Sequence, residues 1–272
     1  YGLLAKYGMQ TQFERYEATL NRITLVVAAV SLLSSSVMVN VSLQLPFIAT
    51  GVVQLIGTLL LFGIPNIRSQ KESHTSLGLS RQFESLKHEL AGRPALQRDL
   101  IAMISTGTAF SVLLYLLPIY YQNAGATLVL IGAISALVMT LAALISSLAG
   151  ARIGIRVTLV AAALSAVVLG FPHLALVIVG AVILQAGQVR LMSRYKSSMV
   201  AGFDTVGEST SLSLVTSATS IGFAVIAPGL GLVAATFGTD LLLVACAVLF
   251  IAAALVSSPA LRSEAAAPQA GG

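Results

Sequence analysis

Long apolar stretches separated by short polar segments dominate the chain. A helix needs about 20 apolar residues to cross the hydrocarbon core of a bilayer. Eight windows fit this length approximately, at residues 22–41, 45–64, 100–121, 127–148, 157–171, 172–191, 209–237 and 240–256. The fifth window is short, and we end it before Pro172 because proline suits the first turn of a helix. The pattern predicts an all-α, polytopic integral membrane bundle of eight transmembrane helices.

A long hydrophilic run at residues 66–99 divides the windows into two blocks and carries six of the fifteen Lys and Arg residues. We expect two spans in residues 1–64, a connecting segment in 65–99, six spans in 100–258 and a disordered tail in 259–272. Within the connecting segment, Leu79, Phe83, Leu86 and Leu90 recur at helical spacing. This spacing predicts an amphipathic helix along the membrane face, and a linker helix is favoured over a regulatory element.

Composition and charge support the membrane assignment. Hydrophobic residues make up 57% of the chain and charged residues 9%, against about 25% charged in soluble domains. With eight spans, all fifteen basic residues fall on one side, which the positive-inside rule places in the cytoplasm. Both termini are therefore expected in the cytoplasm. The basic charge reflects topology, so no nucleic-acid partner is expected, and the single Cys246 excludes a disulfide framework.

The chain offers few groups for catalysis. Of the three histidines, His74 and His88 lie in the connecting segment and His173 lies at the outer edge of the sixth window, and no H-E-x-x-H motif is present. All ten acidic residues also fall in loops or at helix ends, including Glu17 ahead of the first span. Each class of reaction needs convergent groups that this sequence does not offer. We expect no enzyme, no metal site and no cofactor.

Neutral polar residues form stripes on two of the windows. They recur at intervals of three and four, the spacing that places side chains on one face of a helix. Amides are costly in lipid unless paired, so the glutamines are expected to face protein or water. The stripes are Ser105, Thr108, Ser111 and Tyr115 on the third window, and Gln185 and Gln188 on the sixth.

Small hydroxyl residues cluster on two further windows. Such residues allow close helix approach and bond to their own backbone, so packing is favoured over binding. These are Ser31, Ser34, Ser35 and Ser36 on the first window, and Thr216, Ser217, Thr219 and Ser220 on the seventh.

Three strings carry a resemblance to the major facilitator superfamily of transporters. LLYLLPIYYQNAG at 113–125 is similar to the outer end of helix seven and its external loop. SLAGARIGIR at 147–156 resembles the basic loop between helices eight and nine, with Arg152, Gly154 and Arg156 matching. GFAVIAPGLG at 222–231 resembles the signature that kinks helix eleven, here at Pro228. The eight windows then correspond to helices five to twelve, and helices one to four would precede Tyr1.

The sequence also departs from the family pattern. Ser147, Ala151 and Ile155 replace a glycine, an aspartate and an arginine of the basic loop. The missing carboxylate argues against a charge-relay gate there. Ala227 replaces a glycine of the kink signature. The first window, AAVSLLSSSVMVN at 28–40, lacks the G-P of proton-coupled drug antiporters.

The resemblance implies an incomplete facilitator fold, with two helices of the first lobe and a six-helix second lobe. It implies a monomeric secondary transporter in a plasma membrane, such as a bacterial inner membrane. Helices seven and ten line the cavity in the family, and they correspond to the third and sixth windows here. The resemblance therefore implies that both polar stripes bind substrate. The basic loop would form a cytoplasmic gate. Because the expected cavity is uncharged, we expect a neutral or amphiphilic substrate moved by alternating access, with export favoured.

Several alternatives stay open. Either transport is not coupled to a proton or another ion, or the coupling residue precedes Tyr1. The chain is alternatively a truncated, non-transporting membrane scaffold or sensor, or an inactive remnant. Expected partners are the lipid bilayer and a small-molecule substrate.

Overall fold

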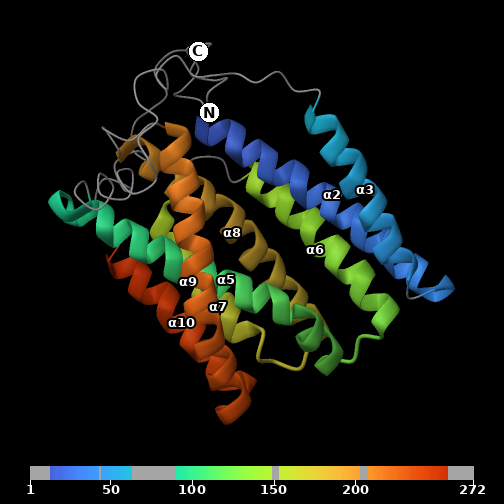
Figure 1. Cartoon of the computed structure of the whole chain (residues 1–272). Coiled ribbons are helices and arrows are strands. Elements are labelled where there is room, and N and C mark those ends of the chain that lie inside the picture. The colour runs from blue at the N-terminus through green and yellow to red at the C-terminus, as the bar shows by residue number, and fades with distance from the viewer. Residues whose placement is uncertain (1–12, 43, 63–89, 149–152, 203–207, 257–272) are drawn as a thin grey trace.

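The computed structural model describes residues 13–42, 44–62, 90–148, 153–202 and 208–256. These residues form helices and the turns between them, with no strand among them (Figure 1). The helices are α2 (Phe13–Val41), α3 (Leu45–Phe62), α5 (Pro94–Asn123), α6 (Leu128–Leu148), α7 (Ile155–Val168), α8 (Leu174–Gly202), α9 (Glu208–Phe237) and α10 (Thr239–Val256). The amphipathic helix expected near 79–90 and the tail from 259 fall outside the described residues, apart from Leu90.

Six of these helices are long and apolar enough to cross a membrane, namely α2, α5, α6, α8, α9 and α10. The apolar parts of α3, at Leu45–Leu60, and of α7, at Ile155–Val168, are shorter. The expected all-helical membrane bundle is therefore confirmed at this level. Crossing by all eight helices stays a prediction, because α7 spans only about 21 Å at 1.5 Å per residue.

The main hydrophobic core lies among helices α5 to α10. The rings of Phe110 on α5 and Phe250 on α10 are both fully buried, with centroids 4.6 Å apart. Small residues bring the helices close together around them. A Cβ on Gly180 of α8 would lie 3.2 Å from the carbonyl oxygen of Ser165 on α7. Because lipid is as apolar as the side chains, such close packing stabilises helix association in a membrane.

Helices α2 and α3 lie at the edge of this core (Figure 1). α2 packs along α6 and α8 through a small cluster in which Leu25 meets Ala142, Ala143, Ala186 and Val189. Nearer the end of α2, a Cβ on Gly132 of α6 would lie only 2.6 Å from the Cβ of Ser36. α3 lies beside α2 (Figure 1), and none of its described side chains is buried.

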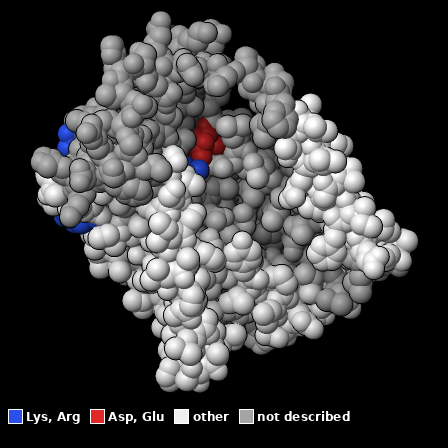
Figure 2. Space-filling model, in the orientation of Figure 1, with Lys and Arg blue, Asp and Glu red and all other residues white. Residues whose placement is uncertain are grey.

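Basic residues gather at one end of the bundle. Consecutive helices run in alternating directions (Figure 1), so every second helix end lies at the same end. The described turns at the opposite end, 42 and 44, 124–127, 169–173 and 238, contain no Lys or Arg. Figure 2 shows charged atoms only on the upper part of the face in view. The described basic residues at the charged end include Arg22, Arg93, Arg98, Arg156, Arg190, Arg194 and Lys196.

Candidate ligand-binding site

Two pockets adjoin between the helices. The first, which we name the α9 pocket, has a volume of about 280 Å³ and is lined by α5, α8 and α9. The second, the α6 pocket, has a volume of about 420 Å³ and is lined by α2, α5, α6 and α8. Ser111 and Gln188 line both pockets, so these two side chains mark the point where the pockets meet.

The polar stripe of α5 faces this junction. Thr108 and Ser111 line the α9 pocket, and Ser111 and Tyr115 line the α6 pocket. The Thr108 hydroxyl donates a hydrogen bond of 2.8 Å to the Ile104 carbonyl oxygen. The Tyr115 ring is 77% exposed and lies against Phe223 of α9, with centroids 6.3 Å apart. Three of the four stripe residues therefore lie where a ligand would bind.

Ser105, the fourth residue of the predicted stripe, lines neither pocket. Each step of three residues falls about 60° short of a full helical turn. Two such steps rotate Ser105 by about 120° away from Ser111 around the helix axis. We therefore leave Ser105 out of the site.

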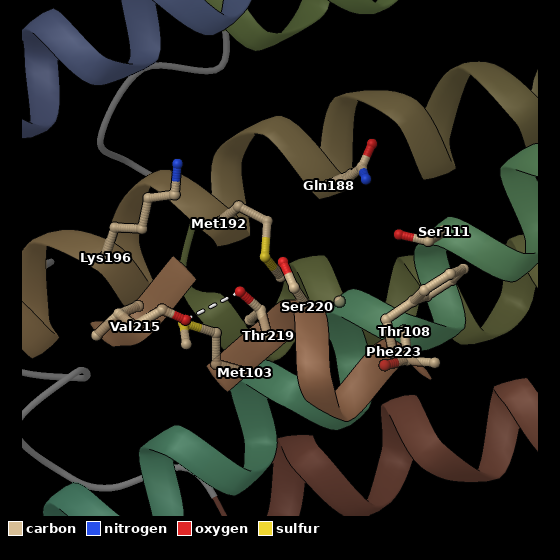
Figure 3. A pocket seen from close by; sticks show the side chains of 11 residues that line it. Met103, Thr108, Ser111, Gln188, Met192, Lys196, Val215, Thr219, Ser220 and Phe223 are labelled. Carbon is tan, nitrogen blue, oxygen red and sulfur yellow. Dashed lines mark hydrogen bonds between the residues drawn. The ribbon is translucent and has the colours of Figure 1, made fainter. Parts of the chain in front are cut away.

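The polar stripe of α8 forms the opposite wall. The Gln185 amide donates to the Gln188 side-chain oxygen at 3.4 Å, a long contact that leaves both amides able to bind other groups. Gln185 lines the α6 pocket and Gln188 lines both pockets. Figure 3 shows the Gln188 side chain across from Ser111. Farther along the same helix, Met192 and Lys196 continue the wall of the α9 pocket.

α9 contributes a third wall that the sequence did not assign to binding. Thr219, Ser220 and Phe223 line the α9 pocket (Figure 3). Both hydroxyls also donate to their own helix, from Thr219 to the Val215 carbonyl oxygen at 2.9 Å and from Ser220 to the Thr216 carbonyl oxygen at 3.0 Å. The expectation that these hydroxyls serve helix packing therefore accounts for their hydrogen bonds to the backbone. It does not account for their place in the pocket wall. Thr219 and Ser220 precede Phe223 by four and three residues, and this helical spacing could have placed all three on one face of the helix.

A buried tyrosine adds a polar group to the α6 pocket. Tyr121 lines this pocket and is fully buried, and its hydroxyl has no hydrogen-bond partner among the described residues. A buried hydroxyl without a partner destabilises the fold by about 1–3 kcal/mol. Because the hydroxyl is itself buried, a ligand or water could accept this hydrogen bond only after neighbouring side chains moved aside.

At the basic end of the α9 pocket, an ion pair connects α2 to a residue of the pocket wall. The Lys196 ammonium lies 2.7 Å from the Glu17 carboxylate of α2. One turn farther along α2, the Asn21 amide donates to the Ser193 hydroxyl at 3.0 Å. The sequence placed Glu17 ahead of the first span, and the structure includes it in the continuous helix α2.

The predicted gate loop lies at the same end. Arg152 falls outside the described residues. Gly154 is the N-cap of α7, and Arg156 follows in its first turn with an exposed side chain. The Arg190 guanidinium of α8 donates to the Ile153 carbonyl oxygen at 2.6 Å, which ties this loop to α8. The described residues of this loop, from Ile153 onward, line neither pocket.

Pro228, the predicted kink, lies inside α9, which continues from Glu208 to Phe237. Proline removes one backbone hydrogen bond and crowds the preceding turn. The helix is not broken at this point, and the kink itself stays a prediction. Among the described residues, no three His, Cys, Asp or Glu side chains come together as a metal site would require.

The fold and these pockets define a class: a helical membrane protein with mainly apolar pockets between its helices, into which a few amide and hydroxyl groups project. Comparisons with known protein families, curated proteins and solved structures find no match. The resemblance to the major facilitator superfamily therefore depends on the sequence motifs alone.

Proposed function

We propose that the chain belongs to a secondary transporter of the major facilitator type, which moves a small organic molecule by alternating access. The observation that carries this proposal is the junction of the two pockets at Ser111 and Gln188. The α6 pocket reaches α2 of the first block, whereas the α9 pocket lies among helices of the second block. A ligand that extends from the junction into the α6 pocket would therefore contact both blocks, as alternating access requires.

The pocket walls support a neutral or amphiphilic substrate. Apolar surface predominates, and amide and hydroxyl groups supply a small number of hydrogen bonds. Such walls are typical of sites that bind drug-sized organic molecules. The charge asymmetry of the described helices supports an orientation with the basic end in the cytoplasm. Export across a bacterial inner membrane is part of this proposal.

Efflux of a hydrophobic dye tests this function. Cells that express the full chain are loaded with Nile red, and the loss of fluorescence is followed over time. Gln188→Leu removes the amide shared by both pockets and should lower the initial rate by about tenfold, the factor that 1.4 kcal/mol represents. Gln54→Leu is the matched control, because Gln54 is exposed on α3 outside both pockets.

Two results would contradict the proposal. Equal rates for Gln188→Leu and the original chain would remove the junction from the transport path. Stable insertion without efflux above that of cells lacking the chain would favour the non-transporting scaffold or sensor.

A further inference from the structure

Lys196 differs from the other described residues that line the two pockets, because it alone carries a charge. It lies on the same face of α8 as Gln188 and Met192, at steps of four residues. Figure 3 shows its side chain at one end of the α9 pocket, with the hydroxyls of Thr219 and Ser220 across the pocket. The pocket therefore has a cationic end and a neutral polar end.

Glu17 of α2 neutralises this cation in the present structure. The Lys196 side chain is 31% exposed and the Glu17 side chain 15% exposed, so the pair is partly shielded from water. A partly desolvated ammonium requires an anionic partner, because an unpaired charge in such a position is strongly unfavourable. Any group that displaces Glu17 must therefore bring a negative charge of its own.

The ion pair is also one of the polar ties between α2 and the second block. Together with the bond from Asn21 to Ser193, it holds α2 against the basic end of α8. α2 also packs along α6, with Leu25 against alanines and Val189 and with Ser36 close to Gly132. Release of Glu17 would therefore weaken the contact of α2 with α8 at the basic end of the bundle.

We propose that the α9 pocket binds the anionic group of an amphiphilic carboxylate at Lys196, and that this group displaces Glu17. This inference depends on the proposed transport function and narrows its substrate to amphiphilic organic anions. The apolar part of the ligand extends past Met192 toward the junction at Gln188. Displacement of Glu17 loosens α2 from α8, so binding favours opening of the bundle at its basic end.

A matched pair of fluorescent probes tests the site. Dansylglycine carries a carboxylate, and dansylglycinamide replaces it with a neutral amide of similar size. Both are titrated into the purified full chain in detergent, and the increase in dansyl fluorescence reports binding. The original chain should bind dansylglycine more tightly than the amide.

Substitutions of the two partners should shift dansylglycine binding in opposite directions. Lys196→Gln should weaken it by about tenfold, as expected for a lost hydrogen bond to a charged group. Glu17→Gln should tighten it several-fold, since it removes the competing carboxylate. Lys196→Arg keeps the charge and should retain the preference for the anion. Binding of dansylglycinamide should change less than about twofold in each variant, and Arg98→Gln, an exposed control, should leave both probes unaffected.

The opposite signs distinguish a ligand site from a structural tie. If Glu17 and Lys196 only held the helices together, both substitutions would change both probes in the same direction, and the inference would be wrong. If dansylglycinamide binds and the affinity for dansylglycine is the same in Lys196→Gln as in the original chain, this inference is overturned. The proposed function would remain intact. Failure of both probes to bind the original chain would contradict the cavity itself.

Displacement of Glu17 has a separate readout. Ser193, which α2 covers, is 2% exposed. In a Cys246→Ala background, Ser193→Cys should react with a maleimide faster when dansylglycine is present and no faster with dansylglycinamide. An unchanged rate with saturating dansylglycine would contradict the loosening of α2.

Discussion

The two blocks of helices are held together in different ways. Helices α5 to α10 share one large core, in which Phe110, Leu113, Leu242 and Phe250 are fully buried. α2 meets this block through small side chains and two polar contacts, and α3 buries none of its described side chains. The first kind of packing fixes one arrangement, because interlocked large side chains leave no room for sliding.

The second kind of packing suits a contact that forms and breaks. Small residues leave smooth helix surfaces, and polar contacts between membrane helices contribute only about 0.6 kcal/mol on average. Separation of this interface would expose Leu25 but none of the aromatic side chains of the main core. The comparison therefore supports a rigid block formed by α5 to α10, against which α2 moves.

The largest effect is expected in the core of the rigid block. Phe110→Ala removes a fully buried ring that packs against Phe250 and should lower the free energy of unfolding by about 3–5 kcal/mol. Phe47→Ala on α3 is the control, because Phe47 is 79% exposed. Unfolding in increasing SDS, followed by circular dichroism, measures both. Equal losses would show that α3 is integrated as tightly as α5.

An intermediate effect is expected where α2 and α6 approach most closely. Gly132→Ala places a methyl group against Ser36 and should destabilise the chain by about 1–3 kcal/mol, the usual range for overpacking. Ser36→Gly should restore the lost stability in the double variant. Gly57→Ala on α3 is the control, because its Cβ would meet nothing within 4 Å.

The same unfolding experiment decides the outcome for this pair. The close approach predicts a favourable coupling between the two substitutions. If Gly132→Ala behaves like Gly57→Ala, the interface between α2 and α6 is looser than the structure indicates.

Helical periodicity in the sequence predicted the helices, and it also grouped Thr108 with Ser111 on one face and Gln185 with Gln188 on another. The structure places these four residues in the walls of the two pockets, and their role in binding stays a prediction. Ser105 was included because a run of i+3 steps drifts around the helix, and only the packed structure shows where the wall ends. Glu17 and Lys196 are separated by 179 positions, so no local pattern pairs them.

The smallest effect is expected for the hydrogen bond between Asn21 and Ser193. A double-mutant cycle with Asn21→Ala and Ser193→Ala should give a coupling energy of about 0.5–1.5 kcal/mol, in the range measured for polar pairs between membrane helices. SDS unfolding of the four chains measures it. A coupling energy of zero would show that this hydrogen bond does not help to hold α2 against α8.

The central claim is that the junction of the two pockets opens in turn to each side of the membrane. Its most direct test is labelling of Gln188→Cys in a Cys246→Ala chain, since Cys246 is the only native cysteine. An impermeant maleimide is added to one side of the membrane at a time. Leu164→Cys, 63% exposed on the apolar face of α7, is the unlabelled control. The account predicts labelling of Gln188→Cys from either side, and labelling from one side only, or from neither, would contradict it.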